Sequence, residues 1–161
     1  NYRMAQEALL GAVPIPAANV HRIRGELGPV AAAAEYDRRL AAVFSASAPA
    51  NARVSTFDLV LLGLGPDGHT ASLFPESAAL DDERWVAPAH APPGVTPAER
   101  VTLTLAALAT AREAVFLISG AGKRAAVARV LGSEPDTRLP AARVVPRHAL
   151  HWLLDREAGP G

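Results

Sequence analysis

Two apolar runs of strand length, each ending in glycine, most strongly limit what this 161-residue chain can fold into. The first is FDLVLLG at residues 57–63, and the second is AVFLISG at residues 114–120. A nearly continuous apolar run is typical of a strand that is covered on both faces of a parallel sheet. Strand, glycine turn and helix are expected twice, at 57–74 and 114–131. This order predicts an α/β fold with an open, mostly parallel sheet and right-handed crossovers.

The remaining segments predict further elements around these two units. Residues 1–10 have helical spacing with Asn1 as the N-cap, and residues 28–44 have it again with Pro29 near the start. Four prolines within residues 88–97 indicate a loop. The other expected elements are a loop at 46–55, strands at 19–23, 100–105, 142–146 and 149–155, and helices at 70–75, 106–113 and 123–132.

Charge and composition narrow the functional classes. The chain has 16 basic and 16 acidic residues, so no overall field attracts nucleic acid or a membrane surface, and an anionic ligand must be held locally. There is no cysteine, which excludes disulfides and thiolate chemistry. No apolar stretch reaches transmembrane length and no signal-peptide pattern opens the chain, so a cytoplasmic location is expected. The length predicts a single domain over residues 1–161, and nothing in the sequence indicates an oligomeric state.

The turn GLGPDGH at 63–69, after the first run, contains the residues best suited to chemistry. Gly63, Gly65 and Gly68 permit positive φ and let backbone N–H groups face a bound oxygen, so we expect them to contact substrate. The imidazole of His69 can take a proton from water, and Asp67 can fix that ring or contact a hydroxyl group. The structural alternative is that the glycines only make a tight turn and His69 caps the next helix.

A second candidate lies in the turn SGAGKR at 119–124, which does not match a Walker phosphate loop. Lys123 is the only lysine among the 16 basic residues, and it stands at an expected helix start. The helix dipole disfavours a cation there unless an anion is bound. Arg100 begins the expected strand after the proline-rich loop, and its guanidinium suits bidentate phosphate binding. An ordinary surface position is the alternative for both residues.

The histidines do not indicate a metal centre. His148 and His151 are three apart in an expected strand, which places them on opposite faces, while His21 and His90 are isolated. The pattern G-x-S-x-G is absent, so the nucleophile elbow of a serine hydrolase is not predicted.

The segment LGLGPDGHTASLFP at 62–75 closely resembles the signature of the 6-phosphogluconolactonases. The resemblance extends along most of the chain and includes NYRMAQEALL, IPAANVHRI, AAAEYDRRL, ERVTLTLAAL, FLISGAGKR and HWLLD. It implies the Rossmann-like α/β fold shared with glucosamine-6-phosphate deaminases and ribose-5-phosphate isomerase, with helices flanking an open, mostly parallel sheet. It also implies that His69 activates the hydrolytic water and that Arg100 and Lys123 line the substrate site.

The reaction implied by this resemblance is hydrolysis of 6-phospho-D-glucono-1,5-lactone to 6-phosphogluconate, a step of the oxidative pentose phosphate pathway. No metal or organic cofactor is expected. The phosphate of the lactone would bind Arg100 and Lys123, and His69 would take a proton from the attacking water. N–H groups of the glycine turn would stabilise the oxyanion, and His69 would return the proton to the leaving ring oxygen.

The sequence departs from the family pattern near its start. Family members begin with a phosphate-holding loop rich in glycine and serine or threonine, followed by an Asp-Glu-Arg motif at another strand end. Neither is found here, since DDERW at 81–85 stands in a different context. We therefore expect residues 1–161 to be the C-terminal two-thirds of a lactonase-like domain. Such a piece is expected to expose a sheet edge and core surface.

Two other functions are weighed against lactone hydrolysis. Amino-sugar-phosphate isomerases and deaminases show a similar strand followed by D-G-H-I-A-F-N-E-P, whose glutamate shuttles protons alongside the histidine. Alignment on Asp67, Gly68 and His69 places Phe74 at that glutamate, and phenylalanine cannot exchange a proton. A non-catalytic phosphosugar-binding domain of a regulator is expected to carry a basic helix-turn-helix, which residues 1–161 lack.

Overall fold

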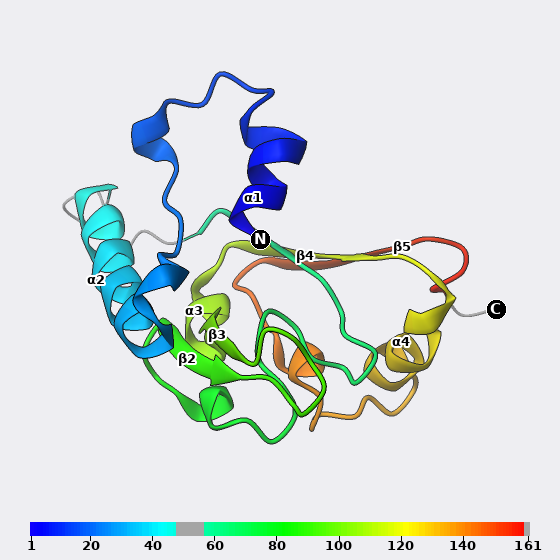
Figure 1. Cartoon of the computed structure of the whole chain (residues 1–161). Helices are drawn as coiled ribbons and strands as arrows, with labels where there is room; N and C mark the ends of the chain where they lie inside the picture. Colours follow the sequence, from blue (N-terminus) through cyan, green and yellow to red (C-terminus); the bar gives the residue numbers. More distant parts are fainter. Residues whose placement is uncertain (48–56, 160–161) are drawn as a thin grey trace.

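The parallel sheet predicted from the two apolar runs is the central feature of the fold (Figure 1). The computed structural model describes residues 1–47 and 57–159, and most of the loop expected at 46–55 lies outside that part. Strands β1 (Leu59–Leu62), β4 (Glu113–Ile118) and β5 (Ala149–Leu154) pair in parallel in the order β1-β4-β5. Because β1 and β4 are parallel neighbours, the glycine turns that follow them leave the same edge of the sheet.

A second, antiparallel sheet is not predicted by the sequence. It consists of β2 (Val86–His90) and β3 (Glu99–Leu103), with His90 paired to Glu99. The expectation of a loop over 88–97 is therefore wrong at 88–90, and the hairpin connection covers residues 91–98. Pro88 is tolerated on β2 because a strand in a two-stranded sheet has a partner along one edge only.

The helical elements of the described residues are α-helices, one π-helical turn and several 3₁₀ turns. The α-helices are α1 (Tyr2–Ala5), α2 (Pro29–Ser47), α3 (Leu105–Thr110) and α4 (Arg124–Leu131). A π-helical turn, η1 (Gln6–Leu10), continues α1, and the 3₁₀ turns are η2 (Ala17–Asn19), η3 (Gly25–Leu27), η4 (Ala78–Asp81), η5 (Ala121–Lys123) and η6 (Pro140–Arg143). None of the helices in this part of the chain is both long and apolar enough to cross a membrane.

Three short elements differ from their predictions. Residues 19–23 form no strand, and the His21 carbonyl instead accepts a hydrogen bond from the Tyr36 hydroxyl at 2.9 Å. Residues 142–146 form no strand because the 3₁₀ turn that begins at Pro140 occupies their start. Residues 70–75 form no helix, and Thr70 and Leu73 make a bridge within a tight turn. The first unit is therefore a strand and a turn, whereas the second has the expected helix.

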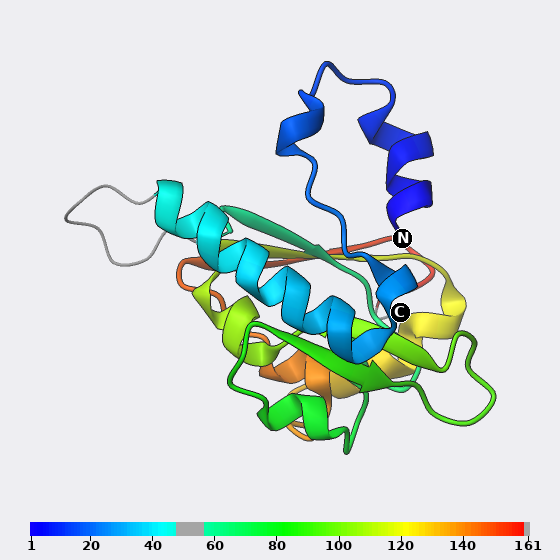
Figure 2. The same cartoon turned by 60° about the vertical axis from the view of Figure 1, so that its left-hand side comes forward.

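Helix α2 covers the antiparallel sheet (Figure 2). It begins at Pro29, as predicted, because proline is tolerated in the first helical turn. Its buried Leu40 and Phe44 belong to a core cluster that includes Val86 of β2. The rings of Phe44 and Trp85 meet edge-on with centroids 5.3 Å apart. This packing fixes the antiparallel sheet against the helix.

The parallel sheet buries one face and exposes the other. On the buried face, Phe116 of β4 stacks on Trp152 of β5 with centroids 4.0 Å apart, within the main core cluster. On the opposite face, Leu61 and Leu153 are 60% and 57% exposed. The expectation that the first run is covered on both faces is therefore wrong for the described residues. Leu117 of the second run is also exposed, at 51%, and α2 packs on the antiparallel sheet rather than on this face.

The N-terminal segment, from α1 to η2, projects away from both sheets in both views (Figures 1 and 2). Asn1 occupies the predicted N-cap position of α1 but makes no hydrogen bond through its side chain. Met4 and Leu9, which share a face of the expected helix, are exposed. This segment therefore contributes little to the two core clusters of the described residues.

Candidate active site

The turn after β1 is closed by its own backbone hydrogen bonds. The N–H of Gly65 donates to the His69 carbonyl at 2.8 Å, and the N–H of Gly68 donates to the Gly65 carbonyl at 3.0 Å. Gly68 has a φ of 86°, and the Ala141 N–H donates to its carbonyl at 3.1 Å. These bonds fix the turn against η6 and fold His69 back beside Gly65.

Asp67 and His69 form a hydrogen-bonded pair on this turn. The Oδ1 atom of Asp67 lies 2.6 Å from Nδ1 of His69 and also accepts the backbone N–H of His69 at 3.2 Å. Because an ionised carboxylate only accepts hydrogen bonds, Nδ1 carries the proton. The Nε2 atom of a neutral His69 is then a free acceptor. The His69 side chain is 24% exposed, so the ring is partly open to solvent.

The electrostatics of Asp67 suit this arrangement. Partial burial raises the pKa of Asp67, but the hydrogen bonds from the ring and backbone of His69 lower it by more, and the net pKa lies below its ordinary value of 3.8. Asp67 is therefore ionised at neutral pH. An imidazole oriented by a carboxylate is a suitable general base for water.

The three glycines of the turn have different physical roles. A Cβ on Gly65 would lie 2.6 Å from Asp67 Oδ1 and would overlap the His69 ring, so only glycine admits the pair. Gly68 supplies the left-handed backbone, where a Cβ would also meet Leu139 at 2.8 Å. Gly63 has open space around its Cβ position, and its carbonyl accepts the Thr70 hydroxyl at 2.9 Å.

The N–H groups of the turn are largely used within it. Those of Gly65, Gly68 and His69 all donate to oxygen atoms of the same turn. An N–H group bonded in this way is not available to an oxyanion. These bonds support a shaping role for Gly65 and Gly68, and contact of the turn with substrate stays a prediction.

Arg100 joins this pair through Phe74, although it comes from the other sheet. The Cζ atom of Arg100 is 5.6 Å from the centroid of the Phe74 ring, and the His69 ring centroid is 4.5 Å from the same ring. Arg100 also donates from Nε to the Pro97 carbonyl at 2.9 Å, which ties it to the hairpin connection. The structure thus gathers Asp67, His69 and Arg100 into one cluster. From the sequence, Phe74 argues only against a deaminase, and its contacts with His69 and Arg100 are not predicted.

Lys123 lies at the same edge of the parallel sheet, where η5 leads into α4. Among the contacts of the described residues, no hydrogen bond or ion pair joins it to Asp67 or His69. Its turn is held by Asp155, which follows β5 and accepts the Ser119 hydroxyl at 2.7 Å and the Gly120 N–H at 2.9 Å. The bond from Ser119, together with backbone N–H groups, holds the pKa of Asp155 below its ordinary range. Asp155 was not predicted, although an acid directly after a strand at this edge was the available signal.

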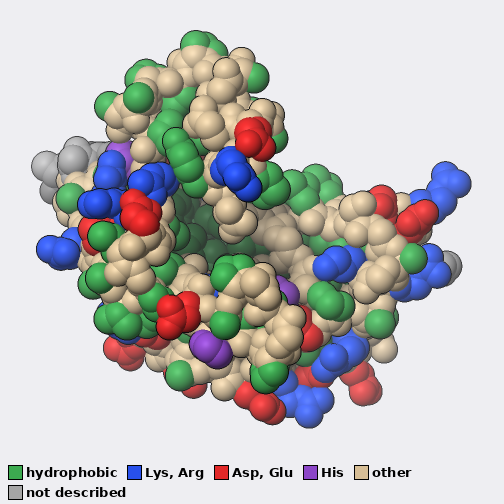
Figure 3. All heavy atoms as spheres, in the orientation of Figure 1, with side chains coloured by type: hydrophobic (Ala, Val, Ile, Leu, Met, Phe, Trp, Pro, Cys, Tyr) green, Lys and Arg blue, Asp and Glu red, His purple; other side chains and the backbone are tan. Residues whose placement is uncertain are grey.

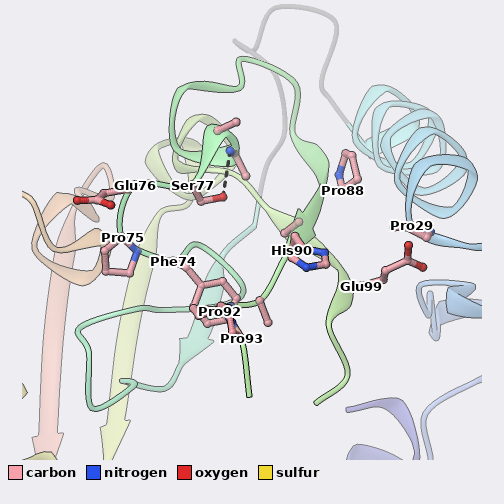
Figure 4. A pocket seen from close by; sticks show the side chains of 14 residues that line it. Pro29, Phe74, Pro75, Glu76, Ser77, Pro88, His90, Pro92, Pro93 and Glu99 are labelled. Atoms are coloured by element: carbon pink, nitrogen blue, oxygen red, sulfur yellow. Dashed lines mark hydrogen bonds between the residues drawn. The ribbon is translucent and has the colours of Figure 1, made fainter. Parts of the chain in front are cut away.

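Two pockets border the cluster. One, of about 810 Å³, lies beneath the N-terminal segment and is lined by Tyr2 and Arg100, and Figure 3 shows it as a hollow with hydrophobic side chains. The other, of about 610 Å³, is lined by Phe74, His90 and several prolines (Figure 4). Arg100 of the cluster lines the first pocket, and Phe74, which contacts the cluster, lines the second, whereas Asp67 and His69 are not among the residues that line either of them. Within the described residues, no three His, Asp or Glu side chains gather in a way that could hold a metal ion.

Comparison with known proteins identifies the class to which this fold and site belong. Residues 1–152 match the family described as glucosamine-6-phosphate isomerases/6-phosphogluconolactonase, and the chain belongs to this family. The 6-phosphogluconolactonase of Homo sapiens is 40% identical over 159 residues, which cover 98% of this chain and 59% of that protein. The 6-phosphogluconolactonase of Mycobacterium tuberculosis is 42% identical over 164 residues, which cover 98% of this chain and 64% of that protein.

A solved structure agrees with these relatives. The crystal structure of 6-phosphogluconolactonase from Leishmania guyanensis matches with a TM-score of 0.77 and 33% identity, covering 100% of this chain and 67% of that one. The match confirms the Rossmann-like α/β class, with an open parallel sheet flanked by helices. The chain spans about three-fifths of the length of the curated relatives above.

Proposed function

We propose that this chain carries the base of an enzyme that hydrolyses 6-phospho-D-glucono-1,5-lactone to 6-phosphogluconate. The observation that carries the proposal is the 2.6 Å contact between Asp67 Oδ1 and His69 Nδ1, in a glycine turn at the carboxyl end of β1. Ligands of open α/β sheets bind outside this edge of the sheet. The names of the two relatives, at 40% and 42% identity, support the lactone as substrate.

The proposed reaction uses His69 first as a base and then as an acid. Its Nε2 atom takes a proton from water, whose oxygen forms a bond to the carbonyl carbon of the lactone. Asp67 holds the proton on Nδ1 and stabilises the imidazolium that forms. When the tetrahedral intermediate collapses, the bond from the carbonyl carbon to the ring oxygen breaks, and His69 returns the proton to that oxygen. The product is the open-chain acid.

The phosphate of the substrate needs local positive charge because the chain has none overall. Arg100 and Lys123 are assigned this role, and the spatial link between Arg100 and His69 through Phe74 supports it. The position of Lys123 at the same sheet edge as His69 supports a second contact. A charged metabolite of this kind also fits the expected cytoplasmic location.

Hydrolysis of two lactones tests the proposal. Acid release from freshly generated 6-phospho-D-glucono-1,5-lactone and from unphosphorylated glucono-1,5-lactone is followed with a pH indicator and compared with the spontaneous rates. We expect a saturable acceleration, proportional to protein, that strongly favours the phosphorylated lactone in kcat/KM. No acceleration of either lactone by protein that is folded by circular dichroism would contradict the function. Equal kcat/KM for both would contradict the phosphate contacts of Arg100 and Lys123.

A further inference from the structure

We propose that Phe74 is a positioning residue that holds His69 and Arg100 in one geometry and so joins the two sheets into a single site. This inference rests on the function proposed above. The Phe74 ring lies 4.5 Å from the His69 ring and 5.6 Å from the Arg100 Cζ atom. Phe74 itself is only 2% exposed, so it acts through these neighbours rather than by contact with substrate.

The segment that carries Phe74 is tied to both sheets by buried hydroxyl groups. The Thr70 hydroxyl donates to the Gly63 carbonyl at the end of β1 at 2.9 Å. The Ser72 N–H donates to the Thr102 hydroxyl at 3.0 Å, on the strand that carries Arg100. Four polar residues are buried among the described residues, and Thr70, Ser72 and Thr102 are three of them. Burial of hydroxyl groups is tolerated only with partners, so these bonds specify where Phe74 lies.

The backbone at both ends of the segment is held in an unusual conformation. Ala71 and Glu76 have φ values of 51° and 64°, and they are the non-glycine residues with positive φ in the part of the chain that the structure describes. Residues with a Cβ rarely adopt this region, and such strain is retained mainly where the surrounding structure imposes it, often at functional sites. Here the two reversals bracket Phe74 and keep its ring buried between His69 and Arg100.

The chemistry of the ring suits both neighbours. Its face attracts the guanidinium of Arg100, whose other contacts are to the hairpin carbonyls of Pro97 and Thr96. Its packing against the imidazole restricts rotation of the His69 ring, while Asp67 fixes Nδ1. A phenyl ring has no polar group that could hydrogen-bond to Nε2 in place of water. Phe74 therefore orients a cation and a base without entering the proton transfer.

The nearly buried Phe74 is also one of the residues that line the pocket of about 610 Å³. Figure 4 shows Phe74 at the edge of the 610 Å³ pocket, with His90 and Glu99 across from it. A side chain without a ring at position 74 would leave room toward this pocket. The His69 ring and the Arg100 guanidinium could then move independently, and the geometry they share would be lost.

Kinetics of Phe74→Leu, Phe74→Tyr and a matched control test the positioning role. Leucine keeps an apolar side chain but removes the ring, and tyrosine restores it. Phe44→Leu removes a ring from the other core cluster, where Phe44 packs on Phe57 and Trp85. We expect Phe74→Leu to lower kcat and raise KM, for a combined loss in kcat/KM of about 10- to 100-fold. Phe74→Tyr should recover most of that loss, and Phe44→Leu should lower Tm while leaving kcat and KM close to the parent values.

Two kinetic results would overturn the proposal while leaving the proposed function intact. One is unchanged kcat and KM in Phe74→Leu, and the other is an equal kinetic loss in Phe44→Leu. If the parent chain hydrolyses no lactone, the proposed function fails and the positioning role is decided by NMR. In that case the His69 ring signals and the Arg100 Nε–H signal should both shift in Phe74→Leu. A shift of only one of them, or no shift beyond that in Phe44→Leu, would show that Phe74 does not couple the two residues.

Discussion

Replacing Gly65 with alanine places a methyl group where the structure has room for none. The added Cβ would lie 2.6 Å from Asp67 Oδ1, whereas ordinary contact begins at 3.4 Å, so that oxygen must retreat by at least about 0.8 Å. The His69 ring overlaps the same Cβ more severely and must move further. Because the overlap displaces the two groups by different amounts, we expect their 2.6 Å hydrogen bond to be lost. The variant therefore separates the base from its orienting carboxylate.

The size of the effect follows from this displacement. A catalytic group misplaced by about 1 Å can lose about 100-fold in rate, equivalent to about 2.7 kcal/mol in the barrier. Overpacking a tight site also lowers the free energy of unfolding by about 1–3 kcal/mol. We expect Gly65→Ala to remain folded at 25 °C and to lose about 100-fold in kcat for lactone hydrolysis, with a smaller change in KM.

The assay compares Gly65→Ala with Gly25→Ala in lactone hydrolysis and in urea unfolding. Gly25 has no atom within 4 Å of its Cβ position, so its variant should keep the parent kcat and lose little stability. NMR of the His69 ring nitrogens reports whether the Nδ1 proton loses its carboxylate partner. A Gly65→Ala variant with the parent kcat and parent ring signals would refute the view that Gly65 exists to admit the Asp67–His69 pair.

Three further variants test separate parts of the site. Lys123→Gln should raise KM for the phosphorylated lactone about tenfold with little change in kcat, because one charged contact to the phosphate is lost. Steady-state kinetics that show an unchanged KM would exclude Lys123 from the phosphate site. Gly68→Ala should lower the free energy of unfolding by about 1–3 kcal/mol, because a Cβ is disfavoured at a φ of 86° and would meet Leu139 at 2.8 Å. A denaturant unfolding curve like that of the parent would contradict this prediction. The pKa of Asp67 is lower in the folded chain than its ordinary value of 3.8. Ionised Asp67 therefore stabilises the fold at any pH above 3.8, and this contribution is lost as the pH falls through the lowered pKa. Asp67→Asn should therefore lose less stability than the parent between pH 7 and about pH 3 in thermal unfolding, and an identical loss in both proteins would exclude Asp67 as a source of acid sensitivity.

Local sequence patterns predicted the parts of the fold that depend on local physics. The apolar runs at 57–63 and 114–120 became neighbouring parallel strands, and Pro29 began α2 because its fixed φ suits a first helical turn. Gly132 follows the last residue of α4, as expected for a helix stop. In each case the conformational preference belongs to the residue or run itself and does not depend on a distant partner.

Elements that depend on distant partners were not predicted. Pro88 is typical of a loop, and the sequence alone does not indicate that its segment pairs with β3. In the structure it lies on β2, opposite Val101. Residues 142–146 look like a strand, but among the described residues no strand pairs with them, and the turn from Pro140 occupies their start. Exposure of Leu61 likewise depends on which sheet α2 covers.

The site residues likewise divide into those related by local spacing and those that only tertiary contacts bring together. Asp67 and His69 are two residues apart, and their contact is one of the two roles that the sequence allowed for Asp67. The family resemblance, rather than residue spacing, implied that Arg100 shares a site with His69, and in the described part of the chain the contacts of Phe74 link the two. Asp155 was missed because its partner turn at Ser119 and Gly120 lies on another strand. Contacts between distant parts of the chain produce no recognisable residue pattern in a single sequence.

The central claim is that His69 is the base for lactone hydrolysis, and His69→Ala tests it most directly. The rate of 6-phospho-D-glucono-1,5-lactone hydrolysis is measured for the parent chain, for His69→Ala and for buffer alone, with both proteins shown to be folded by circular dichroism. We expect acceleration by the parent and, for His69→Ala, a rate within about tenfold of the spontaneous one, because general-base catalysis contributes about 10²–10⁴-fold. Equal acceleration by the parent and by His69→Ala would contradict the role assigned to His69.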